Sequence, residues 1–268
     1  MSVLTEIVSR KRERLEVSKA NVPLSRIREL AHEYRSQAAK HRLGNALKGD
    51  GINIIAEFKR RSPSKGLIRG DVDAGSVAKT YQDGGAIAVS VLTEQDYFSG
   101  SLNDLQKVKS AVALPVLRKD FLFDEYQIYE SAAGGADAIL LIVASLDDEQ
   151  LNRLRELADN ELGMDVLVEV HNELELDRAL AAGASLVGVN NRNLHTFEVS
   201  LETSLNLVLK APSDAILVSE SGLQSSRDLA LLRDAGYRGF LIGESLMRAE
   251  SAVTALRELL RPEPNSSK

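Results

Sequence analysis

The sequence contains no cysteine, and this absence removes several kinds of chemistry at once. Without cysteine, the chain has no disulfide, no thiolate metal site and no cysteine nucleophile. Its few histidines are scattered without the spacing of metal ligands: His32, His41, His171 and His195. We therefore expect no metal site. His171 follows an apolar segment, where we expect it to cap a loop rather than to line a site.

Excess positive charge and long apolar runs are also missing. The 33 lysines and arginines are outnumbered by 39 aspartates and glutamates, which gives a net charge of −6. This balance argues against a nucleic-acid partner, because general nucleic-acid binders carry basic surfaces. No apolar stretch approaches the roughly 18 residues of a membrane span, and Glu6 brings charge too early for a secretory signal. We expect a cytoplasmic protein without a membrane partner.

What the sequence does contain, from residue 52 onward, is an alternation of short apolar segments with amphipathic ones. Period-two apolar patterns predict strands, and patterns with the helical period predict helices. The predicted strands lie near 53–59, 86–91, 115–119, 137–142, 165–170, 185–190, 215–220 and 239–243. The predicted helices lie near 73–83, 102–112, 124–133, 147–161, 172–181, 201–210, 224–234 and 249–260. Such alternation is typical of a parallel sheet built from βαβ units.

Glycine-containing junctions recur along this region about every 50 residues, each between a predicted helix and the next strand: Gly84-Gly85, Gly134-Gly135, Gly183-Ala184 and Gly236-Tyr237. Two βα units fit in that interval, so the repeat predicts eight units. Eight units indicate a single α/β domain over 51–261, a (β/α)₈ TIM barrel, rather than a doubly wound sheet. The missing Gly-x-Gly-x-x-Gly motif after the first strand also disfavours a dinucleotide fold.

The segment 1–50 is predicted to be a helical extension that packs on the barrel. It contains an amphipathic helix at 3–18, whose charged residues between Arg10 and Arg14 we expect to be solvated. A second helix follows Pro23. Residues 34–50 show little periodicity except around three apolar residues: Leu43, Ala46 and Leu47. Residues 262–268 are expected to be a disordered tail.

Charged residues interrupt the apolar pattern at the ends of the predicted strands. In the first strand, Ile55, Glu57 and Lys59 share one face. A buried carboxylate and ammonium are costly unless they are paired or used, and a purely structural ion pair is the alternative explanation. Four later strands also end in polar residues that alternation allows to point inward: Lys119, Glu169, Asn190 and Glu220. Strand ends of a barrel form one rim, so these residues predict a catalytic bowl.

The loops after the last two strands are small and rich in backbone N–H groups. They contain Ser221-Gly222 and Gly243-Glu244-Ser245. In TIM barrels these two loops form the recurrent phosphate site. The basic, hydroxyl-rich loop at 60–65 after the first strand is also suited to a phosphate or carboxylate. We therefore expect a phosphorylated substrate.

Together these segments resemble the indole-3-glycerol-phosphate synthase family. The first-strand signature runs from Ala56 to Gly66, and the other matching segments are Val91–Glu94, Leu117–Phe121, Leu140–Ile142, Val168–Val170, Val189–Leu194, Ser219–Gly222 and Leu241–Met247. The resemblance covers essentially the whole chain, including the extension. It departs at 34–50, regarded as a lid segment, where the family often carries prolines and a phenylalanine near Leu43.

The resemblance implies a reaction and roles for individual residues. The reaction converts 1-(2-carboxyphenylamino)-1-deoxyribulose 5-phosphate to indole-3-glycerol phosphate, carbon dioxide and water in tryptophan biosynthesis, with no cofactor and no obligate protein partner. The implied catalytic residues are Lys119 as general acid, with Glu169, Lys59, Glu57, Asn190 and Glu220. The implied phosphate ligands or their neighbours are Ser62, Arg192, Ser221, Gly222, Gly243 and Ser245. The expected walls for the aromatic ring are Phe98, Phe121, Leu140 and Leu194.

The residues disfavour two alternative functions. One alternative is another phosphate-binding barrel, such as the isomerase of the same pathway. That isomerase resembles a family that uses a cysteine early in the barrel, and this chain contains no cysteine. A catalytically silent barrel that only binds a sugar phosphate would be indicated by loss of Lys119, Lys59 or Glu169, and all three are present.

Overall fold

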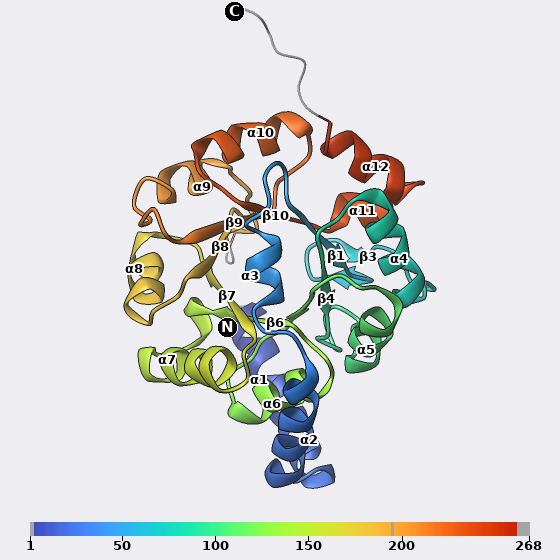
Figure 1. Cartoon of the computed structure of the whole chain (residues 1–268), viewed down its shortest axis with the longest axis vertical. Coiled ribbons are helices and arrows are strands. Elements are labelled where there is room, and N and C mark those ends of the chain that lie inside the picture. The colour runs from blue at the N-terminus through green and yellow to red at the C-terminus, as the bar shows by residue number, and fades with distance from the viewer. Residues whose placement is uncertain (1–2, 194–195, 262–268) are drawn as a thin grey trace, which may run out of the picture.

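The computed structural model describes residues 3–193 and 196–261, and its centre is a closed barrel of parallel strands (Figure 1). Around the barrel, in order, lie β1 (Ile54–Phe58), β4 (Ala88–Leu92), β5 (Val116–Lys119), β6 (Ala138–Ile142), β7 (Asp165–Val170), β8 (Leu186–Asn190), β9 (Ile216–Glu220) and β10 (Gly239–Ile242). The barrel closes where β10 pairs with β1. The predicted (β/α)₈ fold is confirmed, and each barrel strand falls within one or two residues of its predicted range.

Helices on the outside of the barrel connect the strands (Figure 1). They are α4 (Ala74–Gly84), α5 (Leu102–Ala111), α6 (Glu125–Ala133), α7 (Asp148–Glu156), α8 (Glu173–Ala181), α9 (Glu202–Leu207), α10 (Ser226–Ala235), α11 (Glu244–Arg248) and α12 (Ala252–Leu259). Several begin at a side chain that accepts a backbone N–H: Asp73, Ser101, Asp124, Asp147, Asn172, Ser225 and Ser251. Such caps satisfy N–H groups that have no partner within the helix.

Three details of the outer layer differ from the prediction. The single helix predicted at 147–161 is α7 followed by a π-helical turn at Leu157–Glu161, and a 3₁₀ turn lies at Val143–Ser145. The helix predicted at 249–260 is preceded by the separate short helix α11. A small hairpin of β2 (Arg61–Ser62) and β3 (Gly66–Leu67) interrupts the loop after β1. No helix among the described residues is long and apolar enough to cross a membrane.

The alternation of residues along the strands creates two apolar clusters. Ile54, Ala56 and Phe58 face outward and pack in the cluster between sheet and helices. Ile55 faces inward and belongs to a smaller cluster inside the barrel. This inner cluster fills the barrel below the polar rim, so the rim side chains stand on a solid apolar floor.

The extension reaches both ends of the barrel. It consists of α1 (Val3–Asn21), α2 (Leu24–Gln37) and α3 (Arg42–Ala46). In Figure 1 α3 crosses the centre of the barrel. Leu43 and Leu47 are fully buried in the inner cluster. The Leu43 N–H donates to Asp165 Oδ2 at the start of β7 (2.8 Å), and the Asn53 amide donates to Leu47 O and Arg238 O.

These contacts correct the interpretation of 34–50 as a lid. The segment closes the end where the strands begin, away from the charged rim, because its leucines replace solvent at the open bottom of the inner cluster. The predicted solvated face of α1 was also wrong in part. Lys11 Nζ lies 2.6 Å from the buried Asp120 Oδ1, and Arg14 forms a bidentate ion pair with Asp96. The predicted tail, 262–268, lies outside the described residues.

Candidate active site

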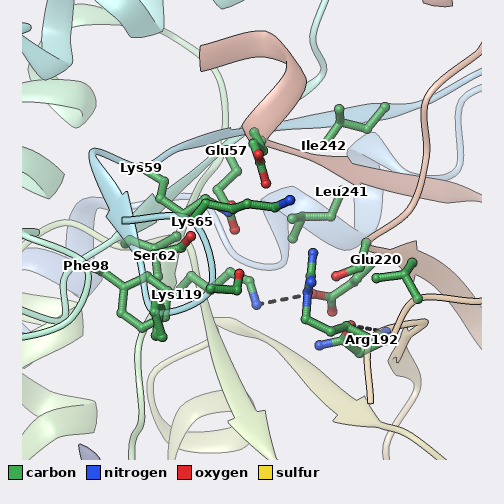
Figure 2. A pocket seen from close by; sticks show the side chains of 18 of the residues that line it. Glu57, Lys59, Ser62, Lys65, Phe98, Lys119, Arg192, Glu220, Leu241 and Ile242 are labelled. Atoms are coloured by element: carbon green, nitrogen blue, oxygen red, sulfur yellow. Dashed lines mark hydrogen bonds and ion pairs between the residues drawn. The ribbon is translucent and has the colours of Figure 1, made fainter. Parts of the chain in front are cut away.

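A cavity of about 720 Å³ opens at the carboxyl ends of the strands (Figure 2). All six predicted catalytic residues line it: Glu57, Lys59, Lys119, Glu169, Asn190 and Glu220. The six predicted phosphate-site residues line it too: Ser62, Arg192, Ser221, Gly222, Gly243 and Ser245. So do Phe98, Phe121 and Leu140, whereas Leu194 lies outside the described residues. From α1, Leu4 and Ile7 contribute apolar surface to the same cavity.

The ammonium group of Lys119 lies at the centre of this bowl. At the end of β5, its Nζ is 3.2 Å from Glu169 Oε2 on β7 and 3.1 Å from Glu220 Oε2 on β9. Burial lowers the pKa of Lys119, but the charges of Glu220, Glu169 and Glu57 outweigh burial and raise it above its usual value. Lys119 is therefore held as a cation.

The two carboxylates beside Lys119 respond differently to their surroundings. Burial raises the pKa of Glu169, yet the cations Lys119 and His171 outweigh it and hold that pKa well below its usual range. Burial also raises the pKa of Glu220, to about 7; Lys119 opposes this effect and the charge of Glu169 adds to it. Glu169 is therefore a fixed anion near neutral pH, whereas Glu220 keeps its proton to a higher pH than an ordinary glutamate does.

A second ion pair lies at the end of β1, where the Nζ of Lys59, the residue after the strand, is 2.5 Å from Glu57 Oε1. The two residues share the inward face of the strand, as the alternation predicts. Glu57 has space because Gly243 lacks a side chain: a Cβ there would overlap Glu57 Oε1. Gly188 on β8 leaves space for Glu220 Oε1 in the same way. The glycines of the rim thus determine where the carboxylates can lie.

Histidine 171 contacts a predicted catalytic residue without lining the cavity itself, a contact that the sequence interpretation did not foresee. It follows β7 two positions after Glu169, and its Nε2 lies 3.3 Å from Glu169 Oε1. Its Nδ1 lies 2.9 Å from Glu175 Oε2, so the ring stands between two carboxylates. The predicted loop-capping role is therefore incomplete. The sequence contained a signal for this contact. Side chains two positions apart along a strand point to the same side, so His171 is expected on the same side as Glu169.

The Asn190–Arg192 segment is tied to the end of β9 by Asn191. The buried Asn191 amide donates to Ser219 Oγ (2.9 Å) and Ser221 O (3.1 Å). Asn190 Nδ2 donates to Glu169 Oε1 (3.2 Å), which joins β8 to β7. These bonds fix the polar ends of three neighbouring strands relative to one another.

Four of the predicted phosphate residues lie in the loops after β9 and β10: Ser221, Gly222, Gly243 and Ser245. β9 and β10 are paired, so the loops that follow them are neighbours. Ser221 (φ 65°) and Gly222 (φ 81°) are both left-handed, which is uncommon for a serine and turns the backbone sharply at the cavity wall. The hydroxyl of Ser62 is buried without a hydrogen-bond partner, and buried polar groups normally have one. These groups are therefore suited to an anionic ligand.

The loop after β1 reaches the cavity through the β2–β3 hairpin, which carries Ser62. A bidentate ion pair of Arg60 with Asp104 holds the base of the hairpin, with both N–O distances at 2.7 Å. Lys65 at the turn also lines the cavity and was not predicted as a site residue (Figure 2). No sequence period identifies it, since it lies in a turn.

The aromatic wall depends on a buried carboxylate in the loop after β4. Glu94 accepts the backbone N–H groups of Asp96, Tyr97 and Phe98, which gives the loop a compact turn. Phe98 thereby meets Phe121, with ring centroids 6.1 Å apart and planes tilted by 41°. Such a pair offers apolar surface to an aromatic ligand. Within residues 3–193 and 196–261, no group of three or more histidine, aspartate or glutamate side chains is arranged to hold a metal ion.

A closed parallel barrel whose C-terminal rim carries buried acids, bases and an anion-binding side defines a (β/α)₈-barrel enzyme. The model of the family described as indole-3-glycerol phosphate synthase matches residues 4–259. The chain belongs to this family.

Individual relatives agree with that assignment. The indole-3-glycerol phosphate synthase of Desulfotalea psychrophila is 48% identical over 97% of this chain and 99% of its own length. The enzyme of the same name from Azospirillum brasilense is 48% identical over 96% and 98%. Among solved structures, thiamine phosphate pyrophosphorylase from Pyrococcus furiosus has a TM-score of 0.59 at 16% identity, covering 81% of this chain and 95% of its own. That last likeness concerns the fold alone.

Proposed function

We propose that the protein closes the pyrrole ring of indole-3-glycerol phosphate, with Lys119 as the general acid. The substrate is 1-(2-carboxyphenylamino)-1-deoxyribulose 5-phosphate, and carbon dioxide and water leave. One observation carries the assignment of Lys119: its ammonium lies between Glu169 and Glu220, 3.2 and 3.1 Å away, at the centre of the cavity. The rival functions, an isomerase or a silent binding barrel, have no observation in their favour.

Binding would orient the substrate by its two ends. The phosphate would lie against Arg192, Ser62 and the loops after β9 and β10, where backbone N–H groups and a cation favour an anion. The aromatic ring would lie on the wall of Phe98, Phe121 and Leu140. Lys59 would bind the carboxylate on the aromatic ring of the substrate. This carboxylate would compete with Glu57 for the ammonium group of Lys59.

Ring closure joins the carboxyl-bearing aryl carbon to the ketone carbon, and the ketone oxygen becomes an alkoxide. Lys119 donates a proton to this oxygen as charge develops on it. The raised pKa of Lys119 keeps the ammonium protonated until the alkoxide, a much stronger base, is present. Asn190 and Glu220 bind the sugar hydroxyls and orient the lysines.

The later steps use the remaining charges. The ring-closed intermediate is cationic, and the anions Glu169 and Glu57 stabilise it until carbon dioxide leaves and the aryl ring regains aromaticity. Dehydration then removes the hydroxyl made from the ketone, with Lys59 as the acid. The carboxylates take up the proton from the neighbouring carbon, which completes the indole.

The test is turnover of the purified protein with this substrate, followed by indole fluorescence, beside Lys119→Ala. We expect chelator-insensitive turnover by the parent and a loss of about 10²-fold or more in the variant. Lys48→Ala, an exposed lysine on the far side of the barrel, is the matched control and should retain full activity. Tight binding of the substrate without turnover by the parent would instead establish a sugar-phosphate-binding barrel.

The cytoplasmic location and the lack of an obligate protein partner and of nucleic-acid binding remain predictions. They rest on composition and on the family resemblance.

A further inference from the structure

Behind Glu169, outside the set of residues that line the cavity, lies an ion-paired histidine that the proposed chemistry does not use. The His171 side chain is only 11% exposed. Its two ring nitrogens face different carboxylates, with Nε2 3.3 Å from Glu169 Oε1 and Nδ1 2.9 Å from Glu175 Oε2. Nδ1 forms a hydrogen bond with Glu175, whereas Nε2 has no hydrogen-bond partner and meets Glu169 Oε1 as an ion-pair contact. In a neutral imidazole with its proton on Nδ1, Nε2 would turn a lone pair toward that carboxylate, so the contact favours the imidazolium, in which both nitrogens carry a proton.

Glu175 fixes the ring in this orientation from the first turn of α8. The same Glu175 Oε2 accepts the backbone N–H of His171 (2.9 Å). Its other oxygen accepts Asn172 Nδ2 (2.9 Å), while the Glu175 N–H donates to Asn172 Oδ1 (3.0 Å). Both oxygens of Glu175 are thus engaged, so the histidine has little freedom to turn away from Glu169.

Glu169 is surrounded by cationic and amide groups from three elements. Lys119 reaches it from β5, Asn190 from β8, and His171 from the loop after β7. Glu220 on β9 repels Glu169 directly, and Glu220 and Glu57 on β1 also attract Lys119. When Lys119 gives its proton to the substrate, His171 is the cation that remains next to Glu169.

We propose that His171 is a positioning residue: as an imidazolium held by Glu175, it keeps Glu169 ionised and directed at the reaction centre after Lys119 has lost its proton. This inference rests on the proposed function, which gives Glu169 the role of stabilising the cationic intermediate. Without the imidazolium, Glu169 would be a buried carboxylate beside a neutral amine, and burial would favour its protonation. The groups around His171 act in the required direction: burial lowers its pKa, but Glu169 and Glu175 outweigh burial and raise it to about 10.

The first measurement does not depend on turnover. ¹⁵N NMR of the labelled protein reports the protonation of each imidazole, and His171 is assigned through the backbone of Val170 and Asn172. We expect both ring nitrogens of His171 to remain protonated at about pH 8, where an ordinary histidine is neutral. Glu175→Gln should lower the pKa of His171 by at least about one unit, because the variant loses one charged hydrogen bond. A His171 that titrates near pH 6.5 overturns the proposal.

The second measurement separates positioning from simple structural support. His171→Gln keeps a donor but has no charge, and His171→Leu removes both. We expect kcat to fall about tenfold in His171→Leu with KM nearly unchanged, and less in His171→Gln. The acid limb of the kcat profile should also move to higher pH, by about one unit in His171→Leu, because Glu169 becomes easier to protonate.

The matched control is His32→Gln, an exposed histidine paired with Glu161 outside the cavity, which should leave the profile unchanged. An acid limb that stays in place in His171→Leu contradicts the proposal even if kcat falls. If the parent protein shows no turnover at all, the proposed function fails, and the NMR result still decides whether His171 is an imidazolium.

Discussion

Replacing Glu220 with glutamine should make the protein more stable at alkaline pH and less active. Glu220 is 1% exposed. Its pKa is raised from 4.5 to about 7, by burial first, against the pull of Lys119 and with the added repulsion of Glu169. Glutamine has nearly the same shape and cannot ionise, so the variant removes this titration with little change in packing.

The sign follows from the two pKa values. A glutamate in the unfolded chain ionises near pH 4.5, whereas in the folded protein Glu220 stays protonated up to about pH 7. The stability that Glu220 contributes is therefore fully present below pH 4.5, falls as the pH rises from there, and is lost once the pH has passed through about 7. At about 1.4 kcal/mol per pKa unit, the cost is about 1 kcal/mol at pH 5 and about 3 kcal/mol at pH 8.

The assay is urea unfolding of parent and Glu220→Gln across this range of pH. The difference in the free energy of unfolding should rise in favour of the variant by about 2 kcal/mol between about pH 5 and pH 8. Contributions that do not depend on pH, such as the altered hydrogen bond to Lys119, cancel in this comparison. Glu149→Gln, an exposed glutamate on α7, is the control and should give a constant difference. A constant difference for Glu220→Gln as well would refute the account of a buried, destabilised carboxylate.

Two further predictions concern the ends of the barrel. Leu43→Ala, at the closed bottom, should lower the free energy of unfolding by about 2–5 kcal/mol and leave KM unchanged, whereas the exposed Leu209→Ala should change stability by less than about 0.5 kcal/mol. Equal effects of the two in urea unfolding would show that α3 does not seal the inner cluster. Gly188→Ala should reduce kcat by about 10²-fold, because its Cβ would overlap Glu220 Oε1 and force the carboxylate, whose Oε2 contacts Lys119, to move. The control in the same fluorescence assay is Gly49→Ala, where a Cβ has ordinary contacts. Unchanged kcat in Gly188→Ala would mean that the position of Glu220 does not matter.

The elements of the barrel could be predicted from the sequence because they depend on local signals. Strand ranges follow from period-two apolar runs, and the glycine junctions mark where helices give way to strands. The inward face of Glu57 and Lys59 follows from alternation alone. The same reasoning placed Lys119, Glu169, Asn190 and Glu220 on one rim, because all strand ends of a parallel barrel meet there.

Short and irregular elements could not be predicted in the same way. The two-residue strands β2 and β3 and the five-residue α11 are too short for a periodic pattern to repeat, so no periodic signal marks them. The segment around Leu43 showed its apolar residues, yet nothing local indicated that they close the bottom of the barrel. The charged face of α1 was read as solvated because the partners of Lys11 and Arg14, Asp120 and Asp96, lie far away in the chain.

By itself, the sequence determined which side chains face the interior and at which end of the strands they lie, because backbone geometry sets both. Only the tertiary structure decided which charges meet. Lys119 and Glu169 are 50 residues apart in the chain and become neighbours only through the order and register in which the strands close. The ionisation of Glu169, Glu220 and His171 depends on those distances and on burial. The sequence therefore specifies the groups of the site, and the closure of the barrel sets their charges.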